Sequence, residues 1–399
     1  MKHLYIENVG PIKKADFELK KFNVIIGPQS SGKSCILKIS SYCTWVEKHI
    51  LIAQDASEFM SGNKFIGWLE HFHKMEGYFN NQPVIGYESQ YMKFEYHYKD
   101  GFSFSWKNSR WSYRQPKVAY IPAERNLVGV IPNWMDLSLK RNNISDFMSD
   151  WNIARSHEHD VELLNLGISY HFDTNNNTDF IKLRGMKPIL LTNSSSGLQS
   201  LIPLLVYLRY ITKDIYKDDT RENLKERKLN EELPLILYNK LIKEKGKAPG
   251  LTTVTGTTEN PKQTFMKIGN YNLSFVDQKD ADRIRRIFNN LTHYKSTVAF
   301  IEEPEENLFP PTQKRLIEWM IDNSKSTSYT IATHSPYVLT AFLEKRDLND
   351  FNLLFIPNMS DQTVLKTATE ETLQEIYDYG VDAFFNIHSL QEENNTCQE

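Results

Sequence analysis

The chain has 399 residues, of which 40% are hydrophobic and 24% are charged, a composition typical of a soluble globular protein. Its formal net charge of -3 excludes a protein-wide basic field for holding nucleic acid, so any such contact needs a local patch. Cys35, Cys43 and Cys397 show no paired or metal-type spacing, and no apolar run has the length of a signal peptide or a membrane span. We therefore expect a cytoplasmic protein that does not contact a membrane.

The first 52 residues predict strands followed by a helix. Residues 4–6 and 15–19 alternate as strands do, on either side of a turn at Gly10. Residues 22–26 form a continuous apolar run, which is typical of a buried central strand, and residues 33–52 then predict a helix.

Residues 93–106 predict an antiparallel hairpin, because aromatic side chains alternate on both sides of Asp100 and Gly101. A base-stacking platform is the alternative use of these aromatic residues. Residues 118–122 predict another buried strand, and residues 201–210 predict an apolar helix.

Two further buried strands are predicted at residues 298–303 and 329–333, each followed by a helix. The alternation of strands and helices predicts an α/β fold with a mostly parallel central sheet. We divide the chain into residues 1–210, an insertion at 211–292, and residues 293–399. The insertion is expected to be mainly helical, with a turn-rich stretch at 245–262 and without the sustained heptads of a coiled-coil arm.

A phosphate-binding loop is predicted between the apolar strand and the first helix. The eight residues that fit the pattern G-x-x-x-x-G-K-[ST] are Gly27, Pro28, Gln29, Ser30, Ser31, Gly32, Lys33 and Ser34, and Cys35 follows them. Backbone N–H groups of such a loop and the following helix N-terminus attract phosphate. Lys33 is expected to reach the β- and γ-phosphates of ATP, and Ser34 to bind Mg²⁺. A chance match is the alternative, and the flanking strand and helix argue against it.

An acidic pair stands where the strand at 298–301 ends. Glu302 is placed to hold Mg²⁺ through water, and Glu303 is placed to orient and polarise the water that attacks the γ-phosphate. The alternative is a solvated acidic turn. After the next strand, His334 is expected beside Glu303, where it could hydrogen-bond the γ-phosphate; a purely structural histidine is the alternative here.

A turn rich in serine precedes the apolar helix. Small hydroxyls and backbone N–H groups at a helix start can bind an anion, and the residues that we assign to this loop are Ser195, Ser196, Gly197 and Gln199. A plain helix N-cap is the alternative.

Taken together, these motifs resemble the ATPase heads of the ATP-binding-cassette (ABC) type found in SMC-like proteins. They resemble more closely the ATPases of the overcoming-lysogenization-defect (OLD) type. The stretches that carry the resemblance are residues 4–12, 120–125, 195–199, 300–310 and 332–336. The resemblance implies an ABC-type P-loop ATPase head with an antiparallel β subdomain and an insertion after the signature loop at 195–199.

The resemblance also implies how such a head works. ATP and Mg²⁺ would be the cofactors, and the signature loop of one subunit would complete the ATP site of its partner. The chain would then form a homodimer or a higher homo-oligomer around sandwiched ATP, so that ATP acts as a switch for subunit contact.

Three positions depart from the family pattern. Gln29 and Ser30 stand where the family usually has Asn-Gly, Glu302 stands where it usually has Asp, and Leu198 replaces the glycine of a cassette transporter. The longer side chain of Glu302 is expected to change the Mg²⁺ geometry and to slow turnover. Leu198, which stands where a transporter has glycine, is expected to affect the contact of the signature loop with the γ-phosphate.

No metal-dependent Toprim nuclease domain is expected in residues 337–399, which are too few for one. A separate effector of nuclease or Toprim type is therefore the expected partner, as in the two-gene antiphage systems Septu and PARIS, which the chain resembles. DNA contact is a further possibility, through a basic face on the insertion. That face would comprise Arg221, Arg227, Lys243, Lys245, Lys247, Arg283, Arg285 and Arg286. The alternative is that these residues form a solvated helical surface whose charge is balanced by neighbouring acids.

Four functions fit the sequence. The first is an ATPase that hydrolyses ATP slowly and controls the effector in an antiphage defence complex. The second is an SMC/RecF-like ATPase that clamps DNA in repair or chromosome maintenance. The third is a nucleotide-binding scaffold without hydrolysis, which Glu303 and His334 argue against, and the fourth is a cassette-transporter subunit, which the insertion after the signature loop disfavours.

Overall fold

A computed structural model describes residues 2–158, 160–217, 224–243, 264–345, 350–357 and 363–380 of the chain. Cys397, Arg221, Lys245, Lys247 and the turn-rich stretch at 245–262 lie outside these residues. Within them, no helix combines the length and the apolar character needed to cross a bilayer.

The central sheet has six strands, in the order β18-β16-β3-β15-β14-β7. Their bounds are β18 Lys366–Thr367, β16 Phe351–Phe355, β3 Phe22–Ile26, β15 Thr327–Ala332, β14 Ser296–Glu302 and β7 Pro116–Ile121. The strands from β16 to β7 are parallel, and β18 is antiparallel to β16. The predicted α/β fold with a mostly parallel central sheet is therefore confirmed.

The strand order sets the position of the site. The phosphate-loop strand β3 and the acidic strand β14 are separated by β15, so the residue that follows β15 lies between the loop and the acidic pair. The helices that follow these strands are α1 Lys33–Ala53, α9 Pro310–Asp322 and α10 Pro336–Lys345.

A second sheet of six strands contains the predicted antiparallel β subdomain: five of its strands pair antiparallel, and the short sixth strand, at residues 363–364, pairs in parallel. Its order is β17-β2-β1-β4-β5-β6, with bounds β17 Thr363–Val364, β2 Ile12–Leu19, β1 Lys2–Val9, β4 Val84–Glu88, β5 Met92–His97 and β6 Gly101–Trp106. The hairpin predicted at residues 93–106 is β5 and β6, and its aromatic side chains serve the core: Phe94 packs against Tyr87, Phe65 and Phe102. Because β17 belongs to this sheet, the predicted segments 1–210 and 293–399 share both sheets.

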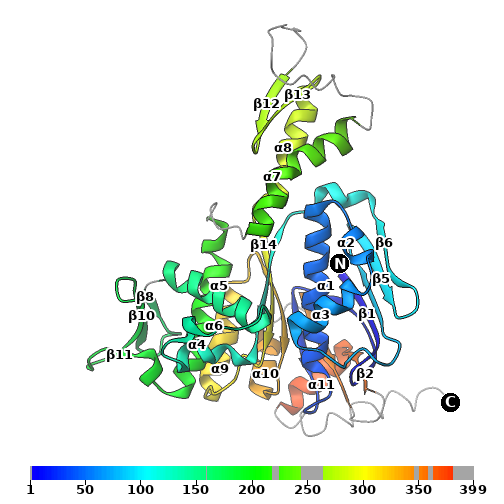
Figure 1. Cartoon of the computed structure of the whole chain (residues 1–399). Helices are drawn as coiled ribbons and strands as arrows, with labels where there is room; N and C mark the ends of the chain where they lie inside the picture. Colours follow the sequence, from blue (N-terminus) through cyan, green and yellow to red (C-terminus); the bar gives the residue numbers. More distant parts are fainter. Residues whose placement is uncertain are drawn as a thin grey trace, which may run out of the picture.

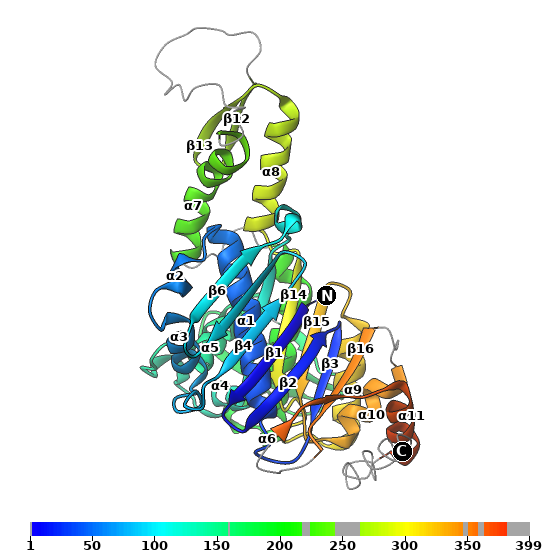
Figure 2. The ribbon, with the colours of Figure 1, turned by 90° about the vertical axis from the view of Figure 1, so that its right-hand side faces the viewer.

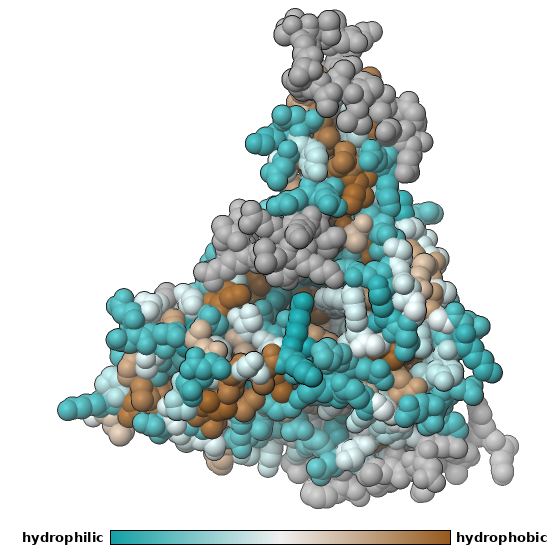
Figure 3. All heavy atoms as spheres, viewed as in Figure 1, coloured by the Kyte–Doolittle hydropathy of each residue, from teal (hydrophilic) through white to brown (hydrophobic). Residues whose placement is uncertain are grey.

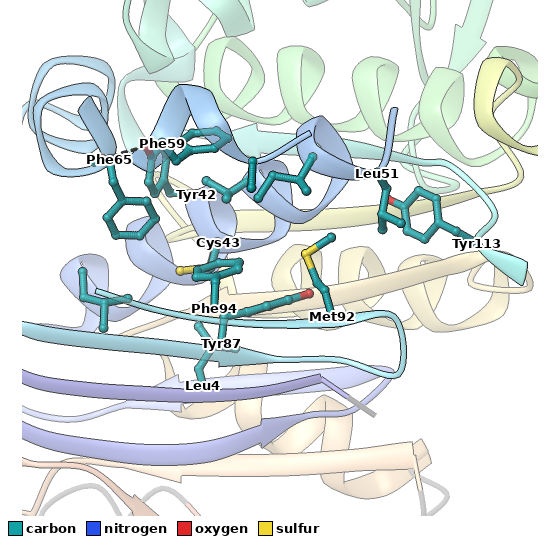
Figure 4. Close-up of a cluster of buried hydrophobic side chains, with 14 of the residues drawn as sticks. Leu4, Tyr42, Cys43, Leu51, Phe59, Phe65, Tyr87, Met92, Phe94 and Tyr113 are labelled. Atoms are coloured by element: carbon teal, nitrogen blue, oxygen red, sulfur yellow. Dashed lines mark hydrogen bonds between the residues drawn. The ribbon is translucent and has the colours of Figure 1, made fainter. Parts of the chain in front are cut away.

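Helix α1 lies between the two sheets and is buried on most of its surface. Figure 4 shows Cys43 of this helix beside Phe94 of the second sheet, Tyr42 beside Phe65, and Leu51 beside Tyr113. One hydrophobic core contains α1, the second sheet and one face of the central sheet, and this core also receives α2 Ser57–Met60 and α3 Lys64–His73. Burial of each large apolar side chain contributes about 1.5–3 kcal/mol, so this layer anchors the phosphate loop firmly.

The other face of the central sheet is covered by helices and by a small third sheet. The elements are α4 Leu127–Val130, α5 Asn143–His157, β8 Asp160–Glu162, β9 Ile168–Asp173, β10 Thr178–Leu183, β11 Ile189–Leu190, α6 Ser196–Thr212, α9, α10 and α11 Glu370–Tyr379. The predicted apolar helix at 201–210 is the buried part of α6. The four-stranded sheet β8–β11 had no counterpart among the sequence predictions.

The insertion is not purely helical, as Figures 1 and 2 show. It comprises α7 Leu224–Tyr238, a π-helical turn Asn239–Lys243, β12 Thr264–Ile268, β13 Tyr271–Phe275 and α8 Gln278–Thr292. We call these residues the arm. The arm projects from the end of the central sheet at which β14 begins, opposite the end that carries Glu302 (Figure 1). Lys240 Nζ donates to the carbonyl of Gln54 at 2.6 Å, which attaches the base of the arm to the end of α1.

A candidate nucleotide-binding site

The predicted phosphate loop joins β3 to α1, and three of its residues have positive φ angles. Gly32 has φ of 98° and Gly27 has φ of 156°, and a Cβ atom on Gly32 would lie 3.0 Å from side-chain atoms of Ile12 and Pro11. Ser30 also has a positive φ, 61°, at the position where the resembled family has glycine. A left-handed conformation costs a non-glycine residue about 1 kcal/mol. The loop therefore keeps the required curl despite the Ser30 departure.

Lys33 is folded back onto this loop. Its Nζ donates to the carbonyl oxygens of Gly27 at 2.9 Å and Pro28 at 2.7 Å, and the residue is buried. Burial lowers the pKa of Lys33 to about 8, although the carboxylates of Glu303 and Glu305 act in the opposite direction. The ammonium is thus held within the loop by two carbonyl groups, whose place phosphate oxygens could take.

This lowered pKa predicts that ATP affinity depends on pH. Lys33 is a cation below about pH 8 and loses its proton as the pH rises above that value. Since the cation is the form that attracts phosphate, the Kd for ATP should rise about tenfold between pH 7 and pH 9. Equilibrium titration at several pH values measures this. The Lys33→Arg variant stays charged over the whole range and should show no such slope; an equal slope in both proteins would contradict the prediction.

The acidic pair lies at the end of β14. Glu302 is buried, and its Oε2 accepts a hydrogen bond from the N–H of Ala123 at 3.3 Å. Glu303 has φ of 41°, and its N–H donates to the carbonyl of Ala332 at 2.8 Å. The Glu302 carboxylate therefore contacts the turn after β7, whereas the backbone at Glu303 turns into the left-handed conformation. The side chain of Glu303 is 41% exposed and so accessible to water.

His334 lies next to Glu303, with 3.6 Å between its Nε2 and the Oε1 of Glu303. Burial, followed by the positive charge of Lys33, lowers the pKa of His334, so the imidazole is neutral at pH 7. The three residues assigned to catalysis from the sequence, Lys33, Glu303 and His334, are therefore gathered at one edge of the central sheet. A neutral imidazole can donate a hydrogen bond from one ring nitrogen and accept one at the other.

A third carboxylate of the acidic turn, that of Glu305, binds the loop that carries His334. The Oε1 of Glu305 accepts hydrogen bonds from the backbone N–H of His334 at 2.7 Å and from the hydroxyl of Thr333 at 2.8 Å. Burial raises the pKa of Glu305. The acidic turn and the histidine loop are thus joined directly, and sequence reasoning gave Glu305 no role.

The predicted signature loop begins helix α6. Ser195 is the N-cap residue, Ser195 and Ser196 are exposed, and the side chain of Gln199 donates to the carbonyl of Thr192 at 3.0 Å. The side chain of Ser195 makes no capping hydrogen bond, so its hydroxyl does not serve as a plain N-cap. A Cβ atom on Gly197 would lie 3.0 Å from the carbonyl oxygen of Asn307, which follows the acidic turn. The signature loop therefore packs against the acidic motif of its own chain.

The chemistry of these groups fits ATP and Mg²⁺. Two buried polar atoms at this edge have no hydrogen-bond partner in the described part of the chain, and they are Ser31 Oγ and Glu305 Oε2. Buried polar atoms are normally satisfied, so such a group is expected where a ligand or water binds. Among the described residues no cluster of three acidic, histidine or cysteine side chains forms a self-contained metal site. Ser34 and Glu302 would instead hold Mg²⁺ together with phosphate oxygens and water, which is how proteins usually bind this ion.

The structure of the chain is similar to several solved structures of SMC head domains. No family model and no curated protein matches the chain. An SMC head domain from Thermotoga maritima is 11% identical, with 92% of this chain and 98% of that chain covered and a TM-score of 0.41. An SMC head bound to the C-winged helix domain of ScpA is 10% identical, with 92% and 98% covered and a TM-score of 0.43. An SMC head with an extended coiled coil, bound to the C-terminal domain of ScpA derived from Pyrococcus furiosus, is 12% identical, with 95% and 99% covered and a TM-score of 0.32.

These likenesses concern the fold alone. The fold and the site together define an α/β protein in which the predicted phosphate loop lies at the carboxyl edge of a parallel sheet.

Proposed function

We propose that this chain is an ATPase subunit of the ABC/OLD-like type, which binds ATP with Mg²⁺ and hydrolyses it slowly. The observation that supports this best is the meeting of three groups at one sheet edge. Glu303 lies 3.6 Å from His334, and both residues interact electrostatically with Lys33. A phosphate-binding cation and a residue that orients the attacking water recur in sites for phosphoryl transfer to water, and the neutral imidazole adds a hydrogen-bond donor beside them.

Each residue has a separate task in the proposed reaction. Lys33 and the loop N–H groups bind the phosphates, and Glu303 orients the attacking water and accepts its proton. His334 donates a hydrogen bond to the γ-phosphate. When bound through Ser34 and Glu302, Mg²⁺ supplies positive charge to the phosphate oxygens. Because Glu302 has one more methylene than aspartate, we expect slow turnover.

We further propose that ATP joins two copies of the chain. The signature loop exposes Ser195 and Ser196 at the N-terminus of α6, where a partner's phosphates could bind. Exposed apolar side chains occur in or shortly after α4 and in β11, and they are Val130, Met135, Leu137 and Leu190. Figure 3 shows a hydrophobic area over this part of the molecule. Apolar surface that gathers in this way favours protein contact. A homodimer or higher homo-oligomer around ATP accounts for both features.

The proposed biological role is control of a separate effector, of nuclease or Toprim type, in an antiphage defence complex. Its support is the resemblance to two-gene defence systems. The arm is also well placed for such a partner, since it projects away from the ATP edge (Figure 1). An SMC/RecF-like clamp on DNA is the second candidate, and the feature that favours it is the pair of exposed residues Arg285 and Arg286 on α8.

Co-expression with the product of the neighbouring gene tests this role. We expect the two proteins to co-purify, ATPase activity to be present, and ATP to change the size of the assembly. The DNA clamp predicts instead that no partner co-purifies and that duplex DNA alone stimulates hydrolysis. In that case the stimulation should fall in an Arg285→Ala/Arg286→Ala variant and persist in Lys279→Ala, a matched control on the same helix. That pattern would refute the effector role.

A further inference from the structure

Arg125 is a buried cation directly behind the acidic turn. It lies in a short 3-10 helix, Ala123–Asn126, that follows β7, and its side chain is fully buried. Its Nη1 donates to the carbonyl oxygen of Glu302 at 2.9 Å and its Nη2 to that of Glu303 at 2.7 Å. Nη1 also donates to the carbonyl of Pro122 at 3.3 Å. One guanidinium thus binds both carbonyl groups of the acidic pair.

The backbone that Arg125 holds is a strained one. Glu303 has φ of 41°, a conformation that costs a residue with a side chain about 1–2 kcal/mol and that persists only where the surroundings enforce it. Arg125 binds the two carbonyl groups with two different nitrogens, which the planar guanidinium holds at a fixed angle, whereas a lysine ammonium binds from a single atom without that fixed geometry. The orientation of the Glu303 peptide, and with it the direction of the Glu303 carboxylate, depends on this contact.

The turn that contains Arg125 also contacts the other parts of the site. The N–H of Ala123 donates to the Glu302 carboxylate, and Gly129 of α4 lies so close to α6 that a Cβ atom there would be 2.8 Å from the carbonyl oxygen of Gln199. The segments on both sides of Arg125 are thus packed against the site, and Arg125 itself is bonded to the end of β14.

We propose that Arg125 is a positioning residue for ATP hydrolysis, which acts by holding Glu303 in the left-handed conformation that directs its carboxylate to the attacking water. This inference rests on the proposed ATPase function. A purely structural alternative exists, because Arg125 also lies 3.8 Å from the carboxylate of Glu306 and could simply neutralise nearby acids. The two explanations predict different results for the Arg125→Lys variant, which keeps the positive charge and loses the fixed geometry of the two guanidinium nitrogens.

Steady-state kinetics and ATP titration of Arg125→Lys test the proposal. We expect kcat to fall by about tenfold to a hundredfold, because a displacement of about 1 Å at a reacting group can cost a hundredfold. The Kd for ATP should stay within about twofold, since Arg125 contacts none of the phosphate-loop residues. Arg125→Met, which fills similar volume without charge, should show the same split and serves if the lysine variant folds poorly. Arg155→Lys is the matched control, because Arg155 is equally buried but binds Asp179 on β10.

The double variant Arg125→Lys/Glu303→Gln separates positioning from stability. If Arg125 acts through Glu303, the double variant should turn over no more slowly than Glu303→Gln alone. Three results would overturn the positioning role alone. The first is a double variant whose kcat loss equals the product of the two single losses. The others are a kcat loss no greater than in the Arg155→Lys control, and an unchanged kcat in folded Arg125→Lys and Arg125→Met. A wild-type protein that binds ATP but never hydrolyses it would overturn the proposed ATPase function and this role together.

Discussion

Replacement of Glu303 with glutamine is expected to stop ATP turnover and to leave ATP binding intact. Glutamine has nearly the same shape and can occupy the same place beside His334, whose Nε2 lies 3.6 Å from the Glu303 carboxylate. It cannot accept the proton of the attacking water. Loss of a general base typically lowers the rate by about 10²–10⁴-fold, so kcat should fall into that range.

The measurement is multiple- and single-turnover hydrolysis together with retention of ATP on the protein. The variant should keep ATP bound and should remain in the ATP-dependent assembly, which size-exclusion chromatography detects. Glu371→Gln is the control, since Glu371 is an exposed residue in the first turn of α11. Turnover of Glu303→Gln at the wild-type rate would remove Glu303 from the catalytic role.

The position of Glu303 was predictable from the sequence, but its conformation was not. A short apolar run followed by acids indicates the carboxyl end of a buried strand, and β14 does end at Glu302. The same reasoning located β3, β7 and β15, because buried parallel strands are continuous apolar runs. The left-handed turn at Glu303 has no such local signal, since glycine is absent and the contacts that enforce it come from Arg125 and Ala332.

Arg125 and Glu305 show what sequence patterns leave out of the site. Both belong to stretches that were recognised, residues 120–125 and 300–310, yet neither received a function. Their importance arises from partners distant in sequence: Arg125 binds Glu303, 178 residues away, and Glu305 binds the backbone of His334, 29 residues away. Hydrogen bonds to backbone carbonyls and N–H groups place little demand on the partner's residue type, so the chain carries no matching pattern at the other end.

The small sheet β8–β11 and the hairpin of the arm were missed for a different reason. Strands β8 and β11 have three and two residues, too few to establish an alternating pattern. Strands β12 and β13 follow a turn-rich stretch, and their alternation, with Met266, Ile268, Leu273 and Phe275 buried, spans only five residues each. Such strands are stabilised by the helices against which they pack rather than by a strong local preference.

Replacement of Lys33 with alanine should have the largest effect of all on nucleotide binding. The Nζ atom already lies within the loop, 2.9 Å and 2.7 Å from the carbonyls of Gly27 and Pro28, so little rearrangement is needed to reach a phosphate. A hydrogen bond to a charged group contributes about 1.5–3 kcal/mol. Loss of one or two such bonds weakens ATP binding by at least about tenfold to a hundredfold. Hydrolysis and ATP-dependent assembly should both disappear.

Thermal unfolding with and without Mg-ATP measures this loss independently of catalysis. ATP at about a hundred times its Kd stabilises a protein by about 2.7 kcal/mol, and the Lys33→Ala variant should lose about half or more of this gain at the same ATP concentration. Lys366→Ala, which removes an exposed cation from β18, should keep the full stabilisation. A Lys33→Ala variant that retained both the stabilisation and the assembly would refute the site, because the same cation is required in the proposed function for holding ATP and for joining two copies of the chain around it.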